Sequence, residues 1–151
     1  MRIIVTGGRD YADEATIRLA LEYLRDRCGG ITVIQGGATG ADALARAWAS
    51  GQDGVSVVTV PANWTKYRKS AGPIRNKIML DQCKPDFVLA FPGGRGTRHM
   101  TNIAVQAGVP VARVHGGMQE SRMRGRLRNM VENVRGRASG RLVRAATQAV
   151  S

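Results

Sequence analysis

The sequence is poor in the residues that mark specialised protein classes. Only 2 of its 151 residues are cysteines, and Cys28 and Cys83 lack the spacing of a metal-binding pair. A disulfide-stabilised secreted scaffold is therefore disfavoured, and we expect two reduced thiols in a cytoplasmic protein. His99 and His115 lie far apart without a companion ligand pattern, so no metal site is predicted. No cofactor is predicted either.

Long hydrophobic runs are also missing, so no transmembrane helix is expected. Met1 leads almost directly into the apolar segment 3–5, which leaves no room for the charged region of a signal peptide. Apolar residues make up 43% of the chain and charged residues 23%, which is ordinary for a soluble globular protein. A chain of this length folds as one domain with a substantial core.

Acidic side chains are scarce. The chain has 11 acidic and 23 basic residues, a formal net charge of +12. Such a surface attracts phosphates and nucleic acids, so an anionic partner is expected. The excess is concentrated near the end, because residues 116–151 contain eight arginines and two glutamates.

Short β-branched segments alternate with amphipathic helical patterns along the first three quarters of the chain. We expect five strands, at 2–6, 31–35, 55–60, 86–91 and 110–114. Asp13 is expected to cap the first helix and Gly29 to end it, and Pro73 to occupy the first position of a later helix. This alternation predicts a Rossmann-like α/β sandwich with a parallel sheet in the order 3-2-1-4-5.

The composition changes after His115, so we divide the chain into a Rossmann-like domain at 1–115 and an arginine-rich helical tail at 116–151. One apolar stripe of the tail consists of Met123, Leu127, Val131 and Val134. A second stripe, after the segment 136–140, consists of Leu142, Val143, Ala146 and Val150. The first stripe either packs on its own domain or is exchanged with a second subunit, and we favour a homo-oligomer.

Three glycine-rich loops follow predicted strands, at 6–10, 36–42 and 92–97. The carboxyl ends of parallel strands lie at one edge of a sheet, so the loops should cluster. Glycine lets backbone N–H groups approach an anion closely, and the following helix N-termini add partial positive charge. Arg9, Arg75 and Arg95 beside these loops suit bidentate phosphate recognition. None of the loops is a Walker motif or a dinucleotide-binding fingerprint.

Four ordered motifs resemble one known family. They are Val5-Thr6-Gly7-Gly8-Arg9-Asp10-Tyr11, Gly36-Gly37-Ala38-Thr39-Gly40-Ala41-Asp42, Ala71-Gly72-Pro73-Ile74-Arg75-Asn76 and Phe91-Pro92-Gly93-Gly94-Arg95-Gly96-Thr97. Over about residues 1–115 the chain resembles the YspA-type, cpYpsA-related branch of the SLOG superfamily. The resemblance implies that the last motif holds a phosphate, that the second lines the same pocket, and that Arg75 points into it.

The loops and the resemblance together give the predicted site. The ligand-binding candidates are Thr6, Gly7, Gly8, Arg9, Gly36, Gly37, Thr39, Gly40, Asn76, Pro92, Gly93, Gly94, Arg95, Gly96 and Thr97. The candidates for a catalytic role are Arg75, Asp10 and Asp42. The two aspartates have an alternative role as caps of a turn and of a helix. Three aromatic residues, Tyr11, Trp64 and Tyr67, are candidates for stacking on a base.

The superfamily includes LOG-type phosphoribohydrolases, which cleave the base from a nucleoside monophosphate, and the DNA-processing protein DprA, which binds single-stranded DNA. The LOG motif continues Pro-Gly-Gly-x-Gly-Thr-x-x-Glu, and this chain has Met100 in place of that glutamate. Methionine offers no carboxylate to the oxocarbenium-like transition state. The sequence thus favours a binding or sensing domain for a nucleotide-derived ligand, with N-glycosidic hydrolysis left open. The alternative is a DprA-like single-stranded nucleic-acid binder that uses the tail.

Overall fold

The computed structural model describes residues 1–149. Its five strands form one parallel sheet with the order β3-β2-β1-β4-β5, which confirms the predicted topology. The strands are β1 (Arg2–Thr6), β2 (Ile31–Gln35), β3 (Val55–Thr59), β4 (Phe87–Ala90) and β5 (Val111–Arg113). In the register of the central pairs, Ile4 lies opposite Ile34 on one side and Val88 on the other.

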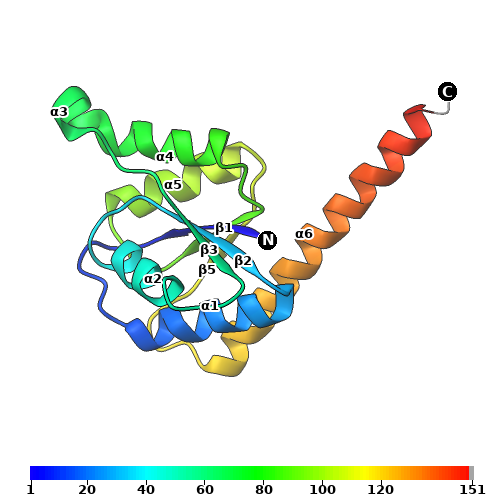
Figure 1. Ribbon diagram of the computed structural model, residues 1–151, viewed down its shortest axis with the longest axis horizontal. Helices are drawn as coiled ribbons and strands as arrows, with labels where there is room; N and C mark the ends of the chain where they lie inside the picture. The colour runs from blue at the N-terminus through cyan, green and yellow to red at the C-terminus, as the bar shows by residue number, and fades with distance from the viewer. Residues whose placement is uncertain (150–151) are drawn as a thin grey trace.

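Helices cover both faces of the sheet, which makes the molecule a three-layer α/β sandwich (Figure 1). They are α1 (Glu14–Cys28), α2 (Ala41–Ala49), α3 (Trp64–Tyr67), α4 (Ala71–Gln82), α5 (Arg95–Gln106) and α6 (Glu120–Ala149), with a short 3₁₀ turn, η1 (Arg68–Ser70). The helices α1, α2 and α6 pack on one face, and α4 and α5 on the other.

The central strand β1 shows why both faces are covered. Its side chains alternate between the faces, as in any strand. Ile3 and Val5 belong to the core beneath α1, α2 and α6, and Ile4 belongs to the core beneath α4 and α5. All three are essentially inaccessible to solvent. A central parallel strand therefore consists of consecutive apolar residues rather than alternating ones.

The expected signals at the ends of α1 are both present. The Asp13 carboxylate accepts a hydrogen bond from the Thr16 backbone N–H at 3.0 Å, which caps the helix. Gly29 follows the last turn with φ of 69°, and its N–H donates to the Arg25 carbonyl.

The connection between β3 and α4 differs from the expectation. It contains α3 and η1, and α4 begins at Ala71, so Pro73 is the third helical residue rather than the first. The reason is that no N–H group in the first turn of a helix has an intrahelical acceptor. Proline is therefore tolerated beyond the first position of that turn.

The tail forms one continuous helix of 30 residues, about 45 Å long. Its first half packs against α1, and its second half projects away from the sandwich (Figure 1). The four residues of the first stripe, Met123, Leu127, Val131 and Val134, are buried within this chain. Of the two expected arrangements, packing of this stripe on its own domain is the one observed, because α1 and the adjoining core cover it, and the homo-oligomer stays a proposal.

The second stripe is solvent-exposed where it is described. Leu142 and Val143 are 72% and 66% exposed, and Val150 lies outside the described residues. Within residues 1–149, no helix combines the length and hydrophobicity that crossing a membrane requires. Cys28 and Cys83 are free thiols, as expected.

Candidate functional site

The three glycine-rich loops meet at the carboxyl ends of β1, β2 and β4. The Gly8 N–H donates to the Pro92 carbonyl at 2.8 Å, which joins the first loop to the third. The Gly8 carbonyl accepts from the Ala41 N–H at 3.1 Å, which joins the first loop to the second. The predicted clustering of the loops is thus a network of backbone hydrogen bonds.

Two glycines allow this close approach. A Cβ atom at Gly40 would lie 2.1 Å from the Gly8 carbonyl oxygen, and the backbone there has φ of +70°. A Cβ at Gly93 would lie 2.6 Å from the Gly8 nitrogen. Gly40, Pro92 and Gly93 therefore lie in the contacts between loops and do not line the cleft described next. Their place in the glycine-rich motifs is therefore explained by the packing of the loops against one another.

A cleft of about 460 Å³ opens above the loops. Twelve predicted residues line it: Thr6, Gly7, Gly8, Arg9, Asp10, Asp42, Arg75, Asn76, Gly94, Arg95, Gly96 and Thr97. An adjoining hollow of about 370 Å³ is lined by the remaining predicted residues, Gly36, Gly37 and Thr39. Arg9, Trp64 and Arg75 border both spaces, so the two are parts of one site.

The N-terminus of α5 forms one wall of the cleft. Gly94 is its N-cap residue and provides no side-chain hydrogen bond to the first turn. The first N–H groups of the helix therefore have no intrahelical or capping partner. A Cβ atom at Gly94 or Gly96 would meet nothing within 4 Å, so the approach to these groups is open. This arrangement suits an anion.

Arg75 connects α4 to the second loop. Its Nη1 donates to the Gly36 carbonyl at 2.6 Å, and its Nε donates to Asn76 Oδ1 at 3.1 Å. Burial lowers the pKa of the Arg75 guanidinium, the nearby Asp42 carboxylate opposes this shift, and Arg9 adds to it. Two donors are thus used within the protein, and Nη2 has no acceptor among the described residues.

Asp42 holds the second loop in place from the first turn of α2. Its Oδ2 accepts hydrogen bonds from the Gly36 N–H at 2.9 Å and the Ala38 N–H at 3.3 Å. Burial raises the pKa of the Asp42 carboxyl, whereas these hydrogen bonds and the charges of Arg75 and Arg46 oppose the shift. Asp42 lies in the first turn of α2 as expected, but its carboxylate holds the preceding loop rather than capping the helix, and it also borders the cleft.

Asn76 links α4 to α5 at the bottom of the cleft. Its amide nitrogen donates to the Gly96 carbonyl at 3.3 Å and lies 3.1 Å from His99 Nδ1. Since the amide oxygen accepts from Arg75, the amide nitrogen faces His99, and the neutral ring then carries its proton on Nε2. His99 also borders the cleft, although it was not among the sequence candidates for the site. The sequence feature that could have identified His99 is its position one helical turn after Arg95, which places the two side chains next to each other on the helix.

Of the three aromatic candidates, Trp64 alone borders the cleft within residues 1–149. It is 48% exposed, and the Arg9 guanidinium lies 5.1 Å from the centre of its ring. Tyr11 packs against Phe91, with ring centres 5.5 Å apart, and its hydroxyl is buried. Tyr67 is absent from the lining of the cleft.

The charge of the cleft is positive. Arg9, Lys69, Arg75 and Arg95 line it, against Asp10 and Asp42. Lys69 was not among the sequence candidates, because the connection before α4 carried no recognisable motif. Met100 is completely buried in the core beneath α4 and α5, so its position contributes no polar group to the site.

Comparisons with known proteins agree with this architecture. The profile of the YspA, cpYpsA-related SLOG family matches residues 1–67. The chain is 41% identical over 117 residues to the Gene 61 protein of Mycobacterium phage D29, covering 73% of this chain and 93% of that protein. It also resembles the X-ray structure of TM1055, a structural genomics target, with a TM-score of 0.55 at 20% identity, covering 73% of this chain and 71% of that one. The latter likeness concerns the fold alone. The chain belongs to the YspA, cpYpsA-related SLOG family.

Proposed function

We propose that this protein binds a phosphate-bearing nucleotide, or a small molecule derived from one, in the cleft at the carboxyl ends of the strands. The observation that carries the proposal is the uncapped N-terminus of α5, which opens through Gly94 and Gly96 into a space lined by arginines. Free N–H groups and a helix dipole bind phosphate without any special side chain. Arg95 and Arg9 add charge-assisted donors.

The dimensions of the site fit a small ligand. A volume of about 460 Å³ lies within the usual range for small-molecule pockets. The adjoining hollow extends the space past Trp64, whose exposed ring offers a flat apolar face to a base. A phosphate at α5 and a base near Trp64 would place the ribose beside Asp10 and Asp42, whose carboxylates accept hydrogen bonds from hydroxyl groups.

Binding or sensing is supported better than hydrolysis. Cleavage of an N-glycosidic bond develops positive charge on the ribose, which a carboxylate stabilises. The position of the LOG-type glutamate is the buried Met100. Asp42 is already hydrogen-bonded to two loop N–H groups, although its Oδ1 accepts none from the described residues. Asp10 is exposed at the rim.

The alternative of single-stranded nucleic-acid binding in this cleft has less support. Such sites stack successive bases on several aromatic rings. Within residues 1–149, Trp64 is the single aromatic side chain on the cleft. One stacking surface suits one base.

The test is thermal denaturation of the full chain with each of the common nucleoside monophosphates, the matching nucleosides, and inorganic phosphate. We expect at least one monophosphate to raise the melting temperature more than its nucleoside does, because a ligand that binds the native state stabilises it. Chromatography of the same mixtures detects released base. Stabilisation without release supports a binding domain, and release establishes a hydrolase. No stabilisation and no release by any member of the panel would refute the proposal.

A further inference from the structure

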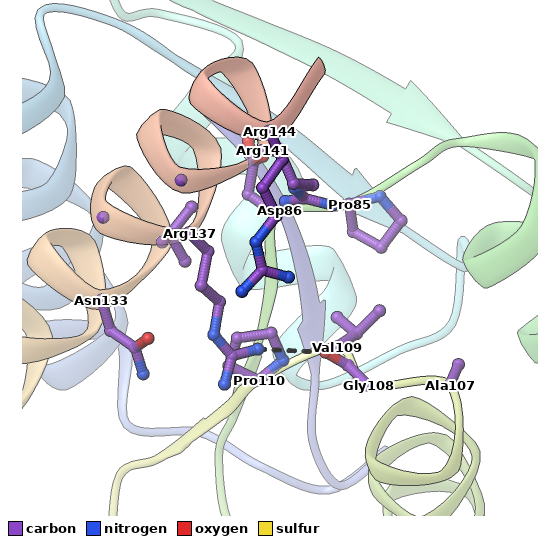
Figure 2. A pocket seen from close by; sticks show the side chains of 13 residues that line it. Pro85, Asp86, Ala107, Gly108, Val109, Pro110, Asn133, Arg137, Arg141 and Arg144 are labelled. Atoms are coloured by element: carbon purple, nitrogen blue, oxygen red, sulfur yellow. Dashed lines mark hydrogen bonds between the residues drawn. The ribbon is translucent and has the colours of Figure 1, made fainter. Parts of the chain in front are cut away.

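A second cleft lies at the amino ends of the strands, on the opposite side of the sheet from the carboxyl-end cleft. It has a volume of about 730 Å³ and runs between the second half of α6 and the segments that precede β4 and β5 (Figure 2). Pro85 and Asp86 come just before β4, and Val109 and Pro110 just before β5. These are the amino ends of the strands, so the second cleft is separate from the nucleotide site.

Three arginines face this cleft from one side of α6. Arg137, Arg141 and Arg144 are spaced four and three residues apart, which places them on one helical face (Figure 2). Arg137 donates to the Gly108 carbonyl at 3.3 Å, at the end of α5. Neither Arg141 nor Arg144 forms an ion pair within residues 1–149.

The cleft has little negative charge to neutralise these arginines. Asp86 is the acidic residue in the lining, and its Oδ2 already accepts from the Arg2 backbone N–H at 2.7 Å. Residues 133–149 contain four arginines and no acidic residue. This half of α6 therefore repels a second copy of itself and attracts a polyanion.

Two glycines lie on the same side of the helix. Gly136 and Gly140 line the cleft one turn apart, and a Cβ atom at either would meet nothing within 4 Å. Internal packing therefore does not require glycine at these positions, where alanine would favour the helix. Their absence of side chains leaves a path along which another backbone can approach α6 closely.

The residues of α6 favour one class of polyanion as the ligand of this cleft. From residue 136 onward, the residues of α6 that line the cleft are glycine and arginine, whereas the exposed Leu142 and Val143 are not part of the lining. An acidic amphipathic helix would thus find no apolar stripe on this half of α6 and would have to use the apolar residues of the opposite wall, Pro85, Val109 and Pro110. The tail contains no aromatic residue, so it offers no ring for the unpaired bases of a single strand. Phosphates of a duplex need only the arginines.

We propose that the second half of α6, together with this cleft, binds the phosphate backbone of double-stranded nucleic acid without sequence specificity. The projection of α6 from the sandwich leaves this half accessible (Figure 1).

The test is fluorescence anisotropy of a labelled 20-base-pair DNA duplex titrated with the full chain at several salt concentrations. The variant is Arg141→Gln/Arg144→Gln, which leaves the Arg137 contact intact. The control is Arg98→Gln/Arg113→Gln, two exposed arginines that do not line the cleft. Both lower the formal net charge of +12 by two. We expect the variant to bind at least about tenfold more weakly and its salt slope to fall by about 2, since each phosphate contact contributes about 0.9.

The control should stay within about twofold of the wild type. Equal weakening of both variants would show that the effect comes from net charge alone, and it would overturn the proposal. So would the absence of duplex binding at about 50 mM salt, equal affinity for the single strand, or displacement of the duplex by poly-glutamate of matched charge. A Gly96→Val substitution in the nucleotide cleft should leave duplex binding unchanged, which separates the two sites experimentally.

Discussion

Arg75 serves two purposes at the scale of single residues. Its bonds to the Gly36 carbonyl and to Asn76 hold the second loop against α4, while its side chain borders both parts of the proposed nucleotide cleft. A Cβ atom at Gly36 would lie 2.0 Å from Arg75 Nη1, so this glycine is required for the guanidinium to reach the loop. The motif that contains Arg75 is therefore tied to the second glycine loop by direct contact.

Replacing Arg75 should weaken phosphate recognition selectively. We expect Arg75→Ala to lower the affinity for a nucleoside monophosphate by about tenfold or more, because a hydrogen bond to a charged group contributes about 1.5–3 kcal/mol. The matching nucleoside should be affected less. Arg75→Lys keeps the charge but loses the planar fork, so it should recover only part of the affinity. Isothermal titration calorimetry of the wild type and both variants with each ligand measures all six affinities. Equal losses for nucleotide and nucleoside would remove Arg75 from phosphate recognition.

Asp42 makes stability depend on pH in a defined direction. Burial raises its pKa in the folded protein, so the folded state holds the proton more tightly than the unfolded state. The stability that this residue contributes is full below 3.8, the ordinary aspartate value, and is lost as pH rises through the raised pKa. Asp42→Asn keeps a hydrogen-bond acceptor but does not ionise.

The free energy of unfolding of Asp42→Asn should therefore rise relative to that of the wild type as pH increases from about 3.5 to 7. Urea denaturation at both pH values measures the difference. Asp53→Asn, at an exposed position, is the matched control. A wild type that gains stability relative to Asp42→Asn over this interval would contradict the assigned cause.

At the scale of elements, α6 has two halves with different surroundings. Leu127 is completely buried beside α1, whereas Leu142 is 72% exposed on the projecting half. We expect Leu127→Ala to lower the free energy of unfolding by about 2–5 kcal/mol, the usual cost of truncating a buried leucine. Leu142→Ala should change it by less than about 0.5 kcal/mol.

Chemical denaturation of both variants at two protein concentrations provides the measurement. A loss for Leu142→Ala that depends on protein concentration would instead show that this leucine is buried in an oligomer. The homo-oligomer proposed from the sequence would then use the second half of α6. Light scattering on the full chain tests the same proposal independently.

The strands were easier to predict from local sequence patterns than the last helix was. The five strands begin within one residue of their expected positions, because β-branched runs between glycines and prolines are strong local signals. The helix α6 continues through Gly136 and Gly140, which lie between its two apolar stripes. Glycine raises the energy of a helix by about 1 kcal/mol, which is too little to interrupt 30 residues that pack at one end.

At the scale of the whole molecule, the strand order followed from the sequence because right-handed crossovers leave few topologies open. The clustering of the loops followed from the same rule. The different roles of the glycines could not be predicted. Gly40 and Gly93 pack between loops, whereas Gly94 and Gly96 face the cleft, although all four occur in similar glycine-rich motifs. His99, Lys69 and the second cleft also depend on tertiary neighbours that no local pattern specifies.

Both clefts are basic, but they lie at opposite edges of one sheet and suit different anions. The first is lined by backbone N–H groups, arginines and one tryptophan, which suits a single nucleotide. The second runs between the projecting half of α6 and the segments that precede β4 and β5, and its arginines all come from α6, which suits a polymer. Under the two proposals, one chain carries a small-molecule site and a polyanion surface.

The most direct test of the central claim is calorimetric titration of a nucleoside monophosphate into the full chain and into Gly96→Val. Gly96 lies in the first turn of α5 with open space at its Cβ position, so valine should block the anion while leaving the fold intact. Gly125→Val, at another helical glycine with no neighbour within 4 Å, is the matched control. We predict binding by the wild type and the control and none by Gly96→Val. Unchanged affinity in a folded Gly96→Val protein would contradict a phosphate site at the N-terminus of α5.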